Sequence, residues 1–453
     1  MSRPRSRRPC LRRPRPVAAL AGLLCLAATA CGGGSPTGQG AAGTTVDAAA
    51  VESALRAGGD LTVWAWEPTL KKVVAGFRAA YPEVHVDLVN AGTGNDQYTA
   101  LQNALKAGSG IPDVAQIEYY ALPQFALGRS LTDLGRFGAG QMQGTFTSGP
   151  WAAVTSGNAV HGLPMDSGPM ALFYNKTIFD RHHVAVPTTW EEYRDAARRI
   201  HEADPEVYIT SDTGDAGFTT SMIWQAGGKP YRVRGTNVKI DMSDAGTKAF
   251  AGLWQELIDE KLLSTIPAWS DEWYKGLGDG TLATLVTGAW MPANFSGAAT
   301  AASGRWRVAP MPQWSAGATA TAENGGSSLA LPAASKNPAL AYGFLRYATA
   351  GDGVAARIDQ GAFPATTADL ESASFRDRKF PYFGGQQVNK VLADSAAHVV
   401  DGWSYLPFQV YANSIYKDTV GKAYTGAATL DKALIAWRDA CTKYGTVQGF
   451  TMQ

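Results

Sequence analysis

Residues 162–176 read GLPMDSGPMALFYNK. The acid in this stretch, Asp166, lies among glycines and prolines, which interrupt helices and strands. The apolar run 170–174 follows directly and predicts a buried strand. A carboxylate at such a break could serve a catalytic site, could accept bonds from nearby backbone amides, or could mark a crossing between two domains. The residues of this stretch leave all three interpretations open.

The chain before this stretch predicts an α/β domain. Strand-like stretches at 61–64, 84–89 and 113–117 alternate with helix-like stretches at 70–81 and 98–107. This β-α-β-α-β order indicates a parallel sheet with helices on its faces. Ligands of such sheets bind beyond the carboxyl ends of the strands. We therefore expect a ligand site near the residues that follow the three strands, at 65–67, 91–94 and 118–120.

The chain after this stretch predicts a second domain, for which 453 residues leave ample room. Thr189 followed by Glu192 is typical of a helix start with a capping box. Further helices are predicted at 191–202, 245–261, 414–423 and 431–442, and further strands at 284–286 and 328–331.

The first thirty residues predict a secretory signal peptide. Seven arginines precede the short apolar run 17–30, which is below the roughly 20 residues that a membrane-spanning helix needs. The residues before Cys31 resemble a bacterial lipobox, which implies that Cys31 is lipidated and begins the mature protein. The Gly/Ser/Thr-rich residues after it predict a flexible tether over 31–58. The arginine-rich head leaves both general secretory and twin-arginine export open.

Removing the signal peptide changes the charge of the protein. The whole chain carries +1, and subtracting the seven arginines leaves −6 for residues 31–453, so nothing indicates nucleic-acid binding. Cys10 and Cys25 leave with the signal, Cys31 would carry lipid, and Cys441 then remains without a partner. We expect no disulfide framework, and the role of Cys441 stays open.

Signatures of catalysis and of cofactor binding are absent from the sequence. It has no Walker motif and no G-x-S-x-G, and the adjacent pair His182-His183 points in diverging directions and predicts surface rather than a metal site. We expect no cofactor and no metal. A pair of carboxylates, such as Glu118 with Asp166, could still form a glycosidase site, because glycosidases need only two acids several ångströms apart.

The number of tryptophans, 13 in the chain, is the feature that favours a ligand-binding site. Several follow strand ends or lie in turns, among them Trp66, Trp224, Trp290 and Trp403, although each of them could equally belong to a core. Indole faces beside carboxylates and amides suit a sugar, because the rings stack on C–H faces while the polar groups bond to hydroxyls.

A series of motifs resembles one known family, the extracellular solute-binding proteins of bacterial ABC importers, in their maltose-binding-like carbohydrate group. Over residues 60–450 the motifs occur in the family's order: WAW, IPDVAQI, GLPMDSGPMALFYNK, PTTWEEY, WQAGG, GDGTLATLVTGAW, NGGSSLAL and LDKALIAW. The resemblance implies a type II periplasmic-binding-protein-like α/β fold, in which two lobes enclose a ligand cleft and are joined by hinge crossovers. Lobe one would comprise 59–166 with 320–368, and lobe two 167–319 with 369–453.

The same resemblance implies a function and a site. The protein would be a monomeric lipoprotein outside the cell membrane, held there by its lipid alone, and not an enzyme. It would bind an oligosaccharide and deliver it by hinge closure to permease subunits with a cytoplasmic ATPase. The implied cleft residues are Trp66, Glu67, Glu118, Tyr119, Tyr120, Asp166, Trp224, Trp290, Gly325, Gly326, Trp403 and Asn413.

Three alternatives remain beside this interpretation. The first is a surface-anchored glycoside hydrolase that uses Glu118 and Asp166. The second keeps the fold and changes the ligand to ferric ion or another small solute, because Tyr119 and Tyr120 form an adjacent tyrosine pair of the kind that ferric-ion binders use. The third is a cell-wall or adhesion module, which would show no saturable binding of a small molecule. The sequence names neither the sugar, with its chain length and linkage, nor the permease.

Overall fold

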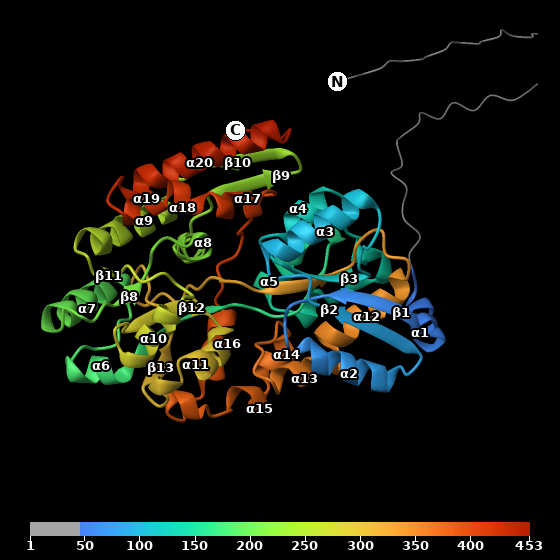
Figure 1. The fold of residues 1–453 in the computed structure, drawn as a ribbon, viewed down its shortest axis with the longest axis horizontal. Coiled ribbons are helices and arrows are strands. Elements are labelled where there is room, and N and C mark those ends of the chain that lie inside the picture. Colours follow the sequence, from blue (N-terminus) through green and yellow to red (C-terminus); the bar gives the residue numbers. More distant parts are fainter. Residues whose placement is uncertain (1–45) are drawn as a thin grey trace, which may run out of the picture. The chain divides into compact units, whose positions relative to one another are not determined.

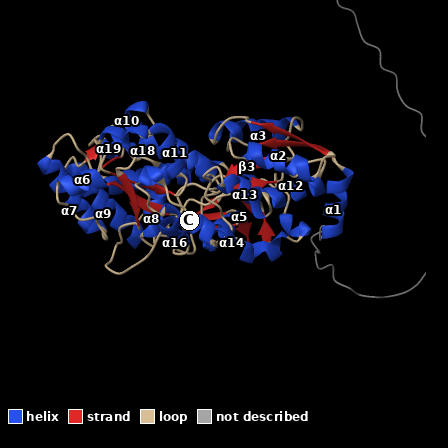
Figure 2. Ribbon diagram, turned by 90° about the horizontal axis from the view of Figure 1, so that it is seen from below, coloured by secondary structure: helices blue, strands red, loops and turns tan. Residues whose placement is uncertain are grey.

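The computed structural model describes residues 46–453, which form two α/β lobes (Figure 1). The blue-to-cyan part of the chain and the orange segment at α12 (Pro338–Ala350) make up the first lobe, and green, yellow and red parts make up the second. In both lobes helices surround the strands (Figure 2). The predicted signal peptide and Cys31 lie outside the described residues. Within 46–453, no helix is both long enough and apolar enough to cross a membrane.

The first lobe is built on a five-stranded sheet. Its order is β2 (Val84–Val89), β1 (Gly59–Trp64), β3 (Val114–Glu118), β14 (Ser327–Ala330) and β6 (Leu163–Pro164). The first three strands are parallel, as their alternation with helices predicts. Strand β14 runs antiparallel to β3, and β6 pairs antiparallel with β14 and so runs in the same direction as the first three. Helices α2 (Leu70–Ala80) and α3 (Asn95–Ala107) connect the parallel strands. The carboxyl ends of β1 and β3 therefore lie side by side, which brings Trp66 near Glu118.

The start of the folded chain differs from the expectation. The predicted tether over 31–58 is wrong for its last part, because Ala48–Ala57 forms helix α1. Asp47 caps this helix by accepting a bond from the Ala50 amide at 2.7 Å. Val51 and Leu55, one turn apart, are buried against α12, where Gly343 leaves room for the Leu55 side chain. This apolar spacing in an alanine-rich stretch is the signal for a helix.

The second lobe contains an antiparallel sheet with β7 (Met170–Asn175) at its centre, between β12 (Thr284–Gly288) and β13 (Trp306–Ala309). Met170 and Leu172 pack into one core cluster, whereas Ala171 and Phe173 pack into another on the opposite face. Because β7 is covered on both faces, its sequence is continuously apolar, as predicted. Smaller sheets pair β8 (Thr210–Ser211) with β11 (Leu263–Ser264), and β10 (Asn237–Ile240) with both β9 (Tyr231–Arg234) and β15 (Thr451–Met452).

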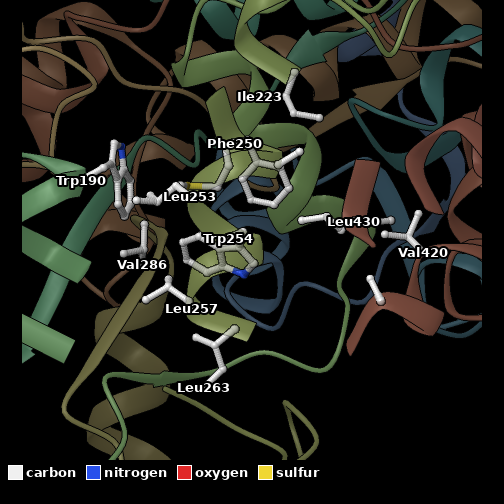
Figure 3. Packing of buried hydrophobic residues seen from close by; sticks show 14 of the residues in the cluster. Trp190, Ile223, Phe250, Leu253, Trp254, Leu257, Leu263, Val286, Val420 and Leu430 are labelled. Atoms are coloured by element: carbon white, nitrogen blue, oxygen red, sulfur yellow. The ribbon is translucent and has the colours of Figure 1, made fainter. Parts of the chain in front are cut away.

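The larger core cluster of the second lobe gathers around α9 (Ala245–Asp259), whose Phe250 and Trp254 lie close to Trp190 and Ile223 (Figure 3). Trp190 begins α7 (Trp190–Ala203), and the predicted capping box between Thr189 and Glu192 is present. The C-terminal helix α20 (Leu430–Val447) closes this core, and its Cys441 is buried. Burial raises the pKa of the Cys441 thiol to about 12, so this cysteine behaves as an unreactive core residue.

Shorter helices complete the lobes. The predicted helix 414–423 is wrong as a single element, because it is divided into three short helices at Ile415 and Val420. The remaining α-helices of residues 46–453 are α4 (Leu122–Leu127), α5 (Ser148–Val154), α6 (Lys176–Arg181), α8 (Ala216–Gln225), α10 (Asp271–Asp279), α11 (Met291–Ala298), α13 (Gly353–Ile358), α14 (Thr367–Glu371), α15 (Ala373–Arg376), α16 (Val388–Ala396), α17 (Gln409–Ser414), α18 (Tyr416–Thr419) and α19 (Gly421–Tyr424).

Two crossover segments, residues 163–170 and 321–327, run beside each other between the lobes. The Met165 amide donates to the Ser327 carbonyl at 2.9 Å, and the Asn324 amide donates to the Gly168 carbonyl at 2.8 Å. A β-carbon on Gly168 would lie 2.3 Å from the Asn324 carbonyl oxygen, so only glycine permits this approach. The stretch that contains Asp166 is therefore a crossing between two lobes.

The position of the second crossing differs from the predicted boundary at residue 320. Ala322 packs into a core cluster of the second lobe, whereas Leu329 packs into that of the first, so the chain changes lobe between them. A third passage lies within residues 363–370, where Phe363 and Leu370 pack into a core cluster of the second lobe and Ala365, between them, packs into that of the first. The other predicted lobe boundaries remain predictions.

Candidate ligand-binding cleft

A cleft of about 400 Å³ is lined by both crossover segments and by residues of both lobes. The first lobe contributes Trp66, Glu67, Gln116, Glu118 and Tyr120. The crossover segments contribute Asp166 and the run 324–327, and the second lobe contributes Asp215, Gly217, Thr220, Ser221, Trp290, Tyr405, Gln409 and Asn413. Aromatic rings and hydrogen-bonding groups thus share this wall, which is the composition of a small-molecule site.

Gln116, a buried residue of β3, fixes the turn after β1. Its side-chain oxygen accepts from the backbone amides of Trp66 at 3.2 Å and Glu67 at 3.1 Å. Its side-chain nitrogen donates to the Ser327 hydroxyl at 3.2 Å, so the same amide also reaches the second crossover segment. Because a buried amide with both ends bonded has one favourable orientation, the Trp66 ring is presented to the cleft from a rigid turn.

One buried cation, Arg357 of α13, lies behind two carboxylates of the cleft. Its Nε is 3.7 Å from Glu67 Oε2, and its Nη2 is 3.6 Å from Asp166 Oδ2. The guanidinium also donates to the Met165 carbonyl and, at 3.3 Å, to the Thr69 hydroxyl. Arg357 is only 1% exposed, so its charge is compensated by these groups rather than by solvent.

Asp166 combines a structural role with a place on the cleft wall. Its Oδ1 accepts from the Ser327 amide at 2.6 Å, and its own carbonyl accepts from the Tyr119 hydroxyl at 2.6 Å. Burial raises the pKa of Asp166 to about 6, against the opposing effects of Arg357 and the Ser327 amide. The acid therefore bonds the neighbouring backbone at the crossing, and its second oxygen faces Arg357.

Glu118 and Tyr120 form the acidic end of the first-lobe wall. The Tyr98 hydroxyl donates to Glu118 Oε2 at 2.9 Å and accepts from the Glu118 amide at 3.0 Å. Burial raises the pKa of Glu118, and burial together with Glu118 raises the pKa of Tyr120 above its ordinary value. Tyr120 consequently remains a neutral phenol that can donate a hydrogen bond.

Trp290, which follows β12 after one intervening residue, forms the aromatic part of the second-lobe wall together with Tyr405. Its Nε1 donates to the Asn324 carbonyl at 2.8 Å. A β-carbon on Gly288 would lie 2.6 Å from this nitrogen, and one on Gly325 would lie 2.9 Å from it. Gly325 also has a φ of +83°, which favours glycine. The Trp290 ring is thus positioned by close contact with two glycines.

Comparison with known proteins decides the family. Residues 64–355 match the family described as bacterial extracellular solute-binding protein. This chain belongs to that family. The predicted family is confirmed, and the family's extracellular description agrees with the predicted extracytoplasmic location.

Two solved structures resemble this solute-binding protein over most of its length. One is the ABC transporter associated binding protein from B. animalis subsp. lactis Bl-04 in complex with β-1,6-galactobiose. It is 46% identical with a TM-score of 0.79, over 87% of this chain and 100% of that one. The other is the galacto-N-biose-/lacto-N-biose I-binding protein from Bifidobacterium longum in complex with lacto-N-biose, 28% identical with a TM-score of 0.77, over 87% and 99% of the two chains.

A curated relative agrees with these neighbours. The arabinooligosaccharide-binding protein of Halalkalibacterium halodurans is 24% identical over 330 residues, which is 71% of this chain and 74% of that one. The relatives are sugar-binding proteins of ABC importers, so the main functional prediction is supported over its alternatives, and the predicted type II two-lobe fold is confirmed. The family and its neighbours consist of binding proteins rather than enzymes.

The cleft of this solute-binding protein brings together most of the residues expected from the sequence. Those on its wall are Trp66, Glu67, Glu118, Tyr120, Asp166, Trp290, Gly325, Gly326 and Asn413. They come from six stretches far apart in sequence, namely the ends of β1 and β3, the two crossover segments, the turn after β12 and helix α17. Contact of each residue with a ligand remains a prediction.

Three expected residues lie elsewhere. Tyr119 is buried beneath the second crossover segment, where its ring approaches Gly326 so closely that a β-carbon there would be 2.5 Å away. Trp224 donates from its indole nitrogen to the Val400 carbonyl at 2.6 Å and stacks on Trp403 at 5.1 Å. Trp224 and Trp403 line a different hollow, which borders the cleft at Tyr405. The prediction that these two tryptophans line the cleft was wrong, because their rings stack on each other in the adjacent hollow.

Several polar residues of the wall were not predicted from the sequence, among them Gln116, Ser221 and Gln409. Gln409 and Asn413, one helical turn apart on α17, are bonded at 2.9 Å, and this i,i+4 amide pair is a signal that could have found Gln409. Ser221 of α8 donates to the Glu323 carbonyl at 2.8 Å and so anchors the second crossover segment to that helix. Nothing local in the sequence distinguishes Ser221 or Gln116 from other buried polar residues.

Proposed function

We propose that this solute-binding protein binds a short β-linked galactoside, with β-1,6-galactobiose as the first candidate, and passes it to the permease of an ABC importer. The proposal rests on the 46% sequence identity between this chain and the B. animalis protein that holds this disaccharide. The similarity extends over the whole length of that protein. The second neighbour, which holds lacto-N-biose, supports a galactose-containing disaccharide at lower identity.

The chemistry of the cleft supports a neutral sugar as its ligand. Trp66 on one wall and Trp290 on the other offer indole faces for the C–H face of a pyranose ring. Glu67 and Glu118 offer acceptors for hydroxyl groups, and Tyr120 offers a donor. A site of this kind binds its ligand through many reversible contacts, as release to a permease requires.

Binding without hydrolysis is part of the proposal. A glycosidase needs one acid free to donate a proton and another free to act as base or nucleophile. Asp166 is instead bonded to the Ser327 amide and faces Arg357, while Glu118 accepts from Tyr98. Ferric ion is disfavoured by the tyrosine pair itself, because Tyr119 is buried and both phenols have a raised pKa, so forming tyrosinates would be costly.

Closure of the two lobes around the sugar would present the loaded form to the permease, with the crossover segments as the hinge. We also propose that lipid on Cys31 holds a monomeric protein at the outer surface of the cell membrane. Replacing Cys31 with alanine should then move the protein from the membrane fraction to the medium.

Calorimetric titration of the purified protein with β-1,6-galactobiose, lactose, maltose and an arabino-oligosaccharide tests the proposed ligand. We expect saturable binding of β-1,6-galactobiose and weaker or no binding of maltose. Chromatography of the sugar recovered after titration should show intact disaccharide, and release of galactose would instead indicate a hydrolase. Absence of saturable binding to either galactoside would contradict the proposal.

A pair of tryptophan variants tests the position of the site. Trp290→Ala should weaken binding of β-1,6-galactobiose about tenfold or more, because the ring lines the cleft. Trp403→Ala removes the same chemistry from outside the cleft and should leave the affinity within about twofold. Equal losses from both variants would show that the ligand lies elsewhere. Unfolding curves without sugar establish that each variant is folded.

A further inference from the structure

Beside the cleft, the second lobe contains a smaller hollow of about 90 Å³, here named the side pocket. The aromatic part of its wall consists of Tyr193, Phe218, Trp254, Trp269 and Trp273. Asp215 and Asn324 line both the side pocket and the cleft, so the two spaces adjoin at these residues. The side pocket is much smaller than the cleft of about 400 Å³, and it is therefore suited to an extension of the cleft's ligand rather than to a separate one.

Trp269 is held in an unusual position at the mouth of the side pocket. It precedes α10, its φ is +71°, and 50% of its surface is exposed. A left-handed backbone is unfavourable for a residue with a β-carbon, and exposing an indole face to water is unfavourable as well. Core packing explains neither feature, because the neighbouring Trp273 is buried and already fills the interior at this point.

The ring of Trp269 continues the aromatic surface of the cleft. Its centroid is 5.4 Å from that of Trp290, with 40° between the ring planes, and 5.0 Å from that of Trp273. Trp290 lines the cleft and Trp269 lines the side pocket. Two indole rings in contact thus lead from the sugar site proposed above into the side pocket.

The acids of the side pocket have different roles. The Asp212 carboxylate is fully engaged, because it accepts from the Gly214 amide, the Trp254 indole and the Tyr424 hydroxyl, each at 2.8 Å. Trp254, which Figure 3 shows within the core, is oriented by this bond. Asp215 is exposed and uses Oδ1 to cap α8 through the Phe218 amide at 2.6 Å. Its other oxygen can accept from a ligand where the two spaces adjoin.

We propose that the side pocket binds one additional hexose unit of a sugar whose other units occupy the cleft. The unit stacks on Trp269 and donates a hydrogen bond from one of its hydroxyl groups to Asp215. The preferred ligand is accordingly a trisaccharide or a longer oligosaccharide rather than a disaccharide. This inference rests on the proposed function, because it extends the same ligand by one unit.

Titration of the wild-type protein with β-1,6-galactobiose and β-1,6-galactotriose tests the inference. The trisaccharide should bind about fivefold more tightly, as one added aromatic contact predicts. Trp269→Gly removes the ring and suits the φ of +71°, so the variant is expected to fold. It should abolish the preference for the trisaccharide and leave the affinity for the disaccharide within about twofold. Trp269→Phe, which keeps an aromatic face, should retain much of the preference.

A matched control is Val447→Ala, which truncates another exposed apolar side chain. Val447 lies on α20 and lines neither the cleft nor the side pocket. It should change neither affinity. Equal affinity of the wild type for the two sugars would overturn the inference and leave the proposed function intact. An equal loss of both affinities in Trp269→Gly would overturn it too, since Trp269 would then only support Trp290. Failure of both sugars to bind the wild type would contradict the proposed function and the inference together.

Discussion

The two walls of the cleft are held in place by different kinds of contact. In the first lobe, buried polar groups do this: Gln116 bonds the turn at Trp66, and Arg357 lies behind Glu67 and Asp166. In the second lobe, Trp290 is positioned by close packing against Gly288 and Gly325. A polar network is sensitive to loss of charge, whereas a packed contact is sensitive to added volume. We therefore expect the first-lobe wall to be disrupted by loss of a buried charge and the second-lobe wall by an added side-chain atom.

Removing the buried cation should have the largest effect. Arg357→Met leaves Glu67 and Asp166 without their compensating charge, and we expect the free energy of unfolding to fall by about 3 kcal/mol. Urea unfolding measures this change. Arg346→Met, which alters an exposed arginine on α12, is the matched control and should cost no more than about 0.5 kcal/mol. Similar small losses in both variants would show that the first-lobe wall does not depend on its charge network.

Adding one methyl group to the second-lobe wall should have an intermediate effect. A β-carbon on Gly288 would lie 2.4 Å from the Asn324 carbonyl oxygen and 2.6 Å from the Trp290 nitrogen. We expect Gly288→Ala to lower the free energy of unfolding by about 2 kcal/mol and to weaken sugar binding by displacing Trp290. Urea unfolding and calorimetric titration measure the two effects.

Gly297→Ala provides the comparison for this substitution. Gly297 lies in α11 with no atom within 4 Å of an added β-carbon, so alanine should be neutral there or stabilise the helix. If Gly288→Ala were equally harmless, the second-lobe wall would be more adaptable than its contacts indicate.

The crossover segments carry a third kind of contact, and its effect should be the smallest. Glu323 is buried and accepts from the Ser167 hydroxyl at 2.9 Å and from the Gly168 amide at 2.5 Å. Burial raises its pKa to about 7, so between its unfolded-state pKa and pH 7 the folded state binds more protons than the unfolded state. Stability should therefore fall as the pH rises, by about 1 kcal/mol between pH 5 and pH 6 from this residue.

Glu323→Gln should remove that part of the pH dependence. Urea unfolding of both proteins at pH 5 and pH 6 measures the difference between their slopes. Asp166 and Asp212 also have raised pKa values, each to about 6, so some slope should remain in the variant. Identical slopes in the two proteins would mean that Glu323 does not bind an extra proton in the folded state.

The local pattern of the chain was sufficient to predict most elements. The parallel strands β1, β2 and β3, the buried strand β7 and the capping box of α7 all follow from periodicity and from side chains close in sequence. The same rule applied to 48–57 would have found α1, whose Val51 and Leu55 are one turn apart, but the glycine-rich residues before it led to the prediction of a tether.

Sequence position was less informative about the site. Trp290 and Trp224 both occur near glycines, yet one lines the cleft and the other stacks on Trp403. Their difference depends on partners more than thirty residues away, Asn324 for Trp290 and Val400 for Trp224. Buried residues such as Gln116 and Arg357 could not be assigned either, because their partners come from separate parts of the chain.

The sequence by itself determined the α/β class, the family and the general place of the cleft, because strand and helix periods and the ends of β-strands are local properties. It also indicated that Asp166 lies at a break before a buried strand. Only the tertiary structure decided that this break runs beside residues 321–327, that Asp166 bonds Ser327 and faces Arg357, and which tryptophans line the cleft. These facts depend on contacts between distant segments, and such contacts are set by packing and charge in three dimensions.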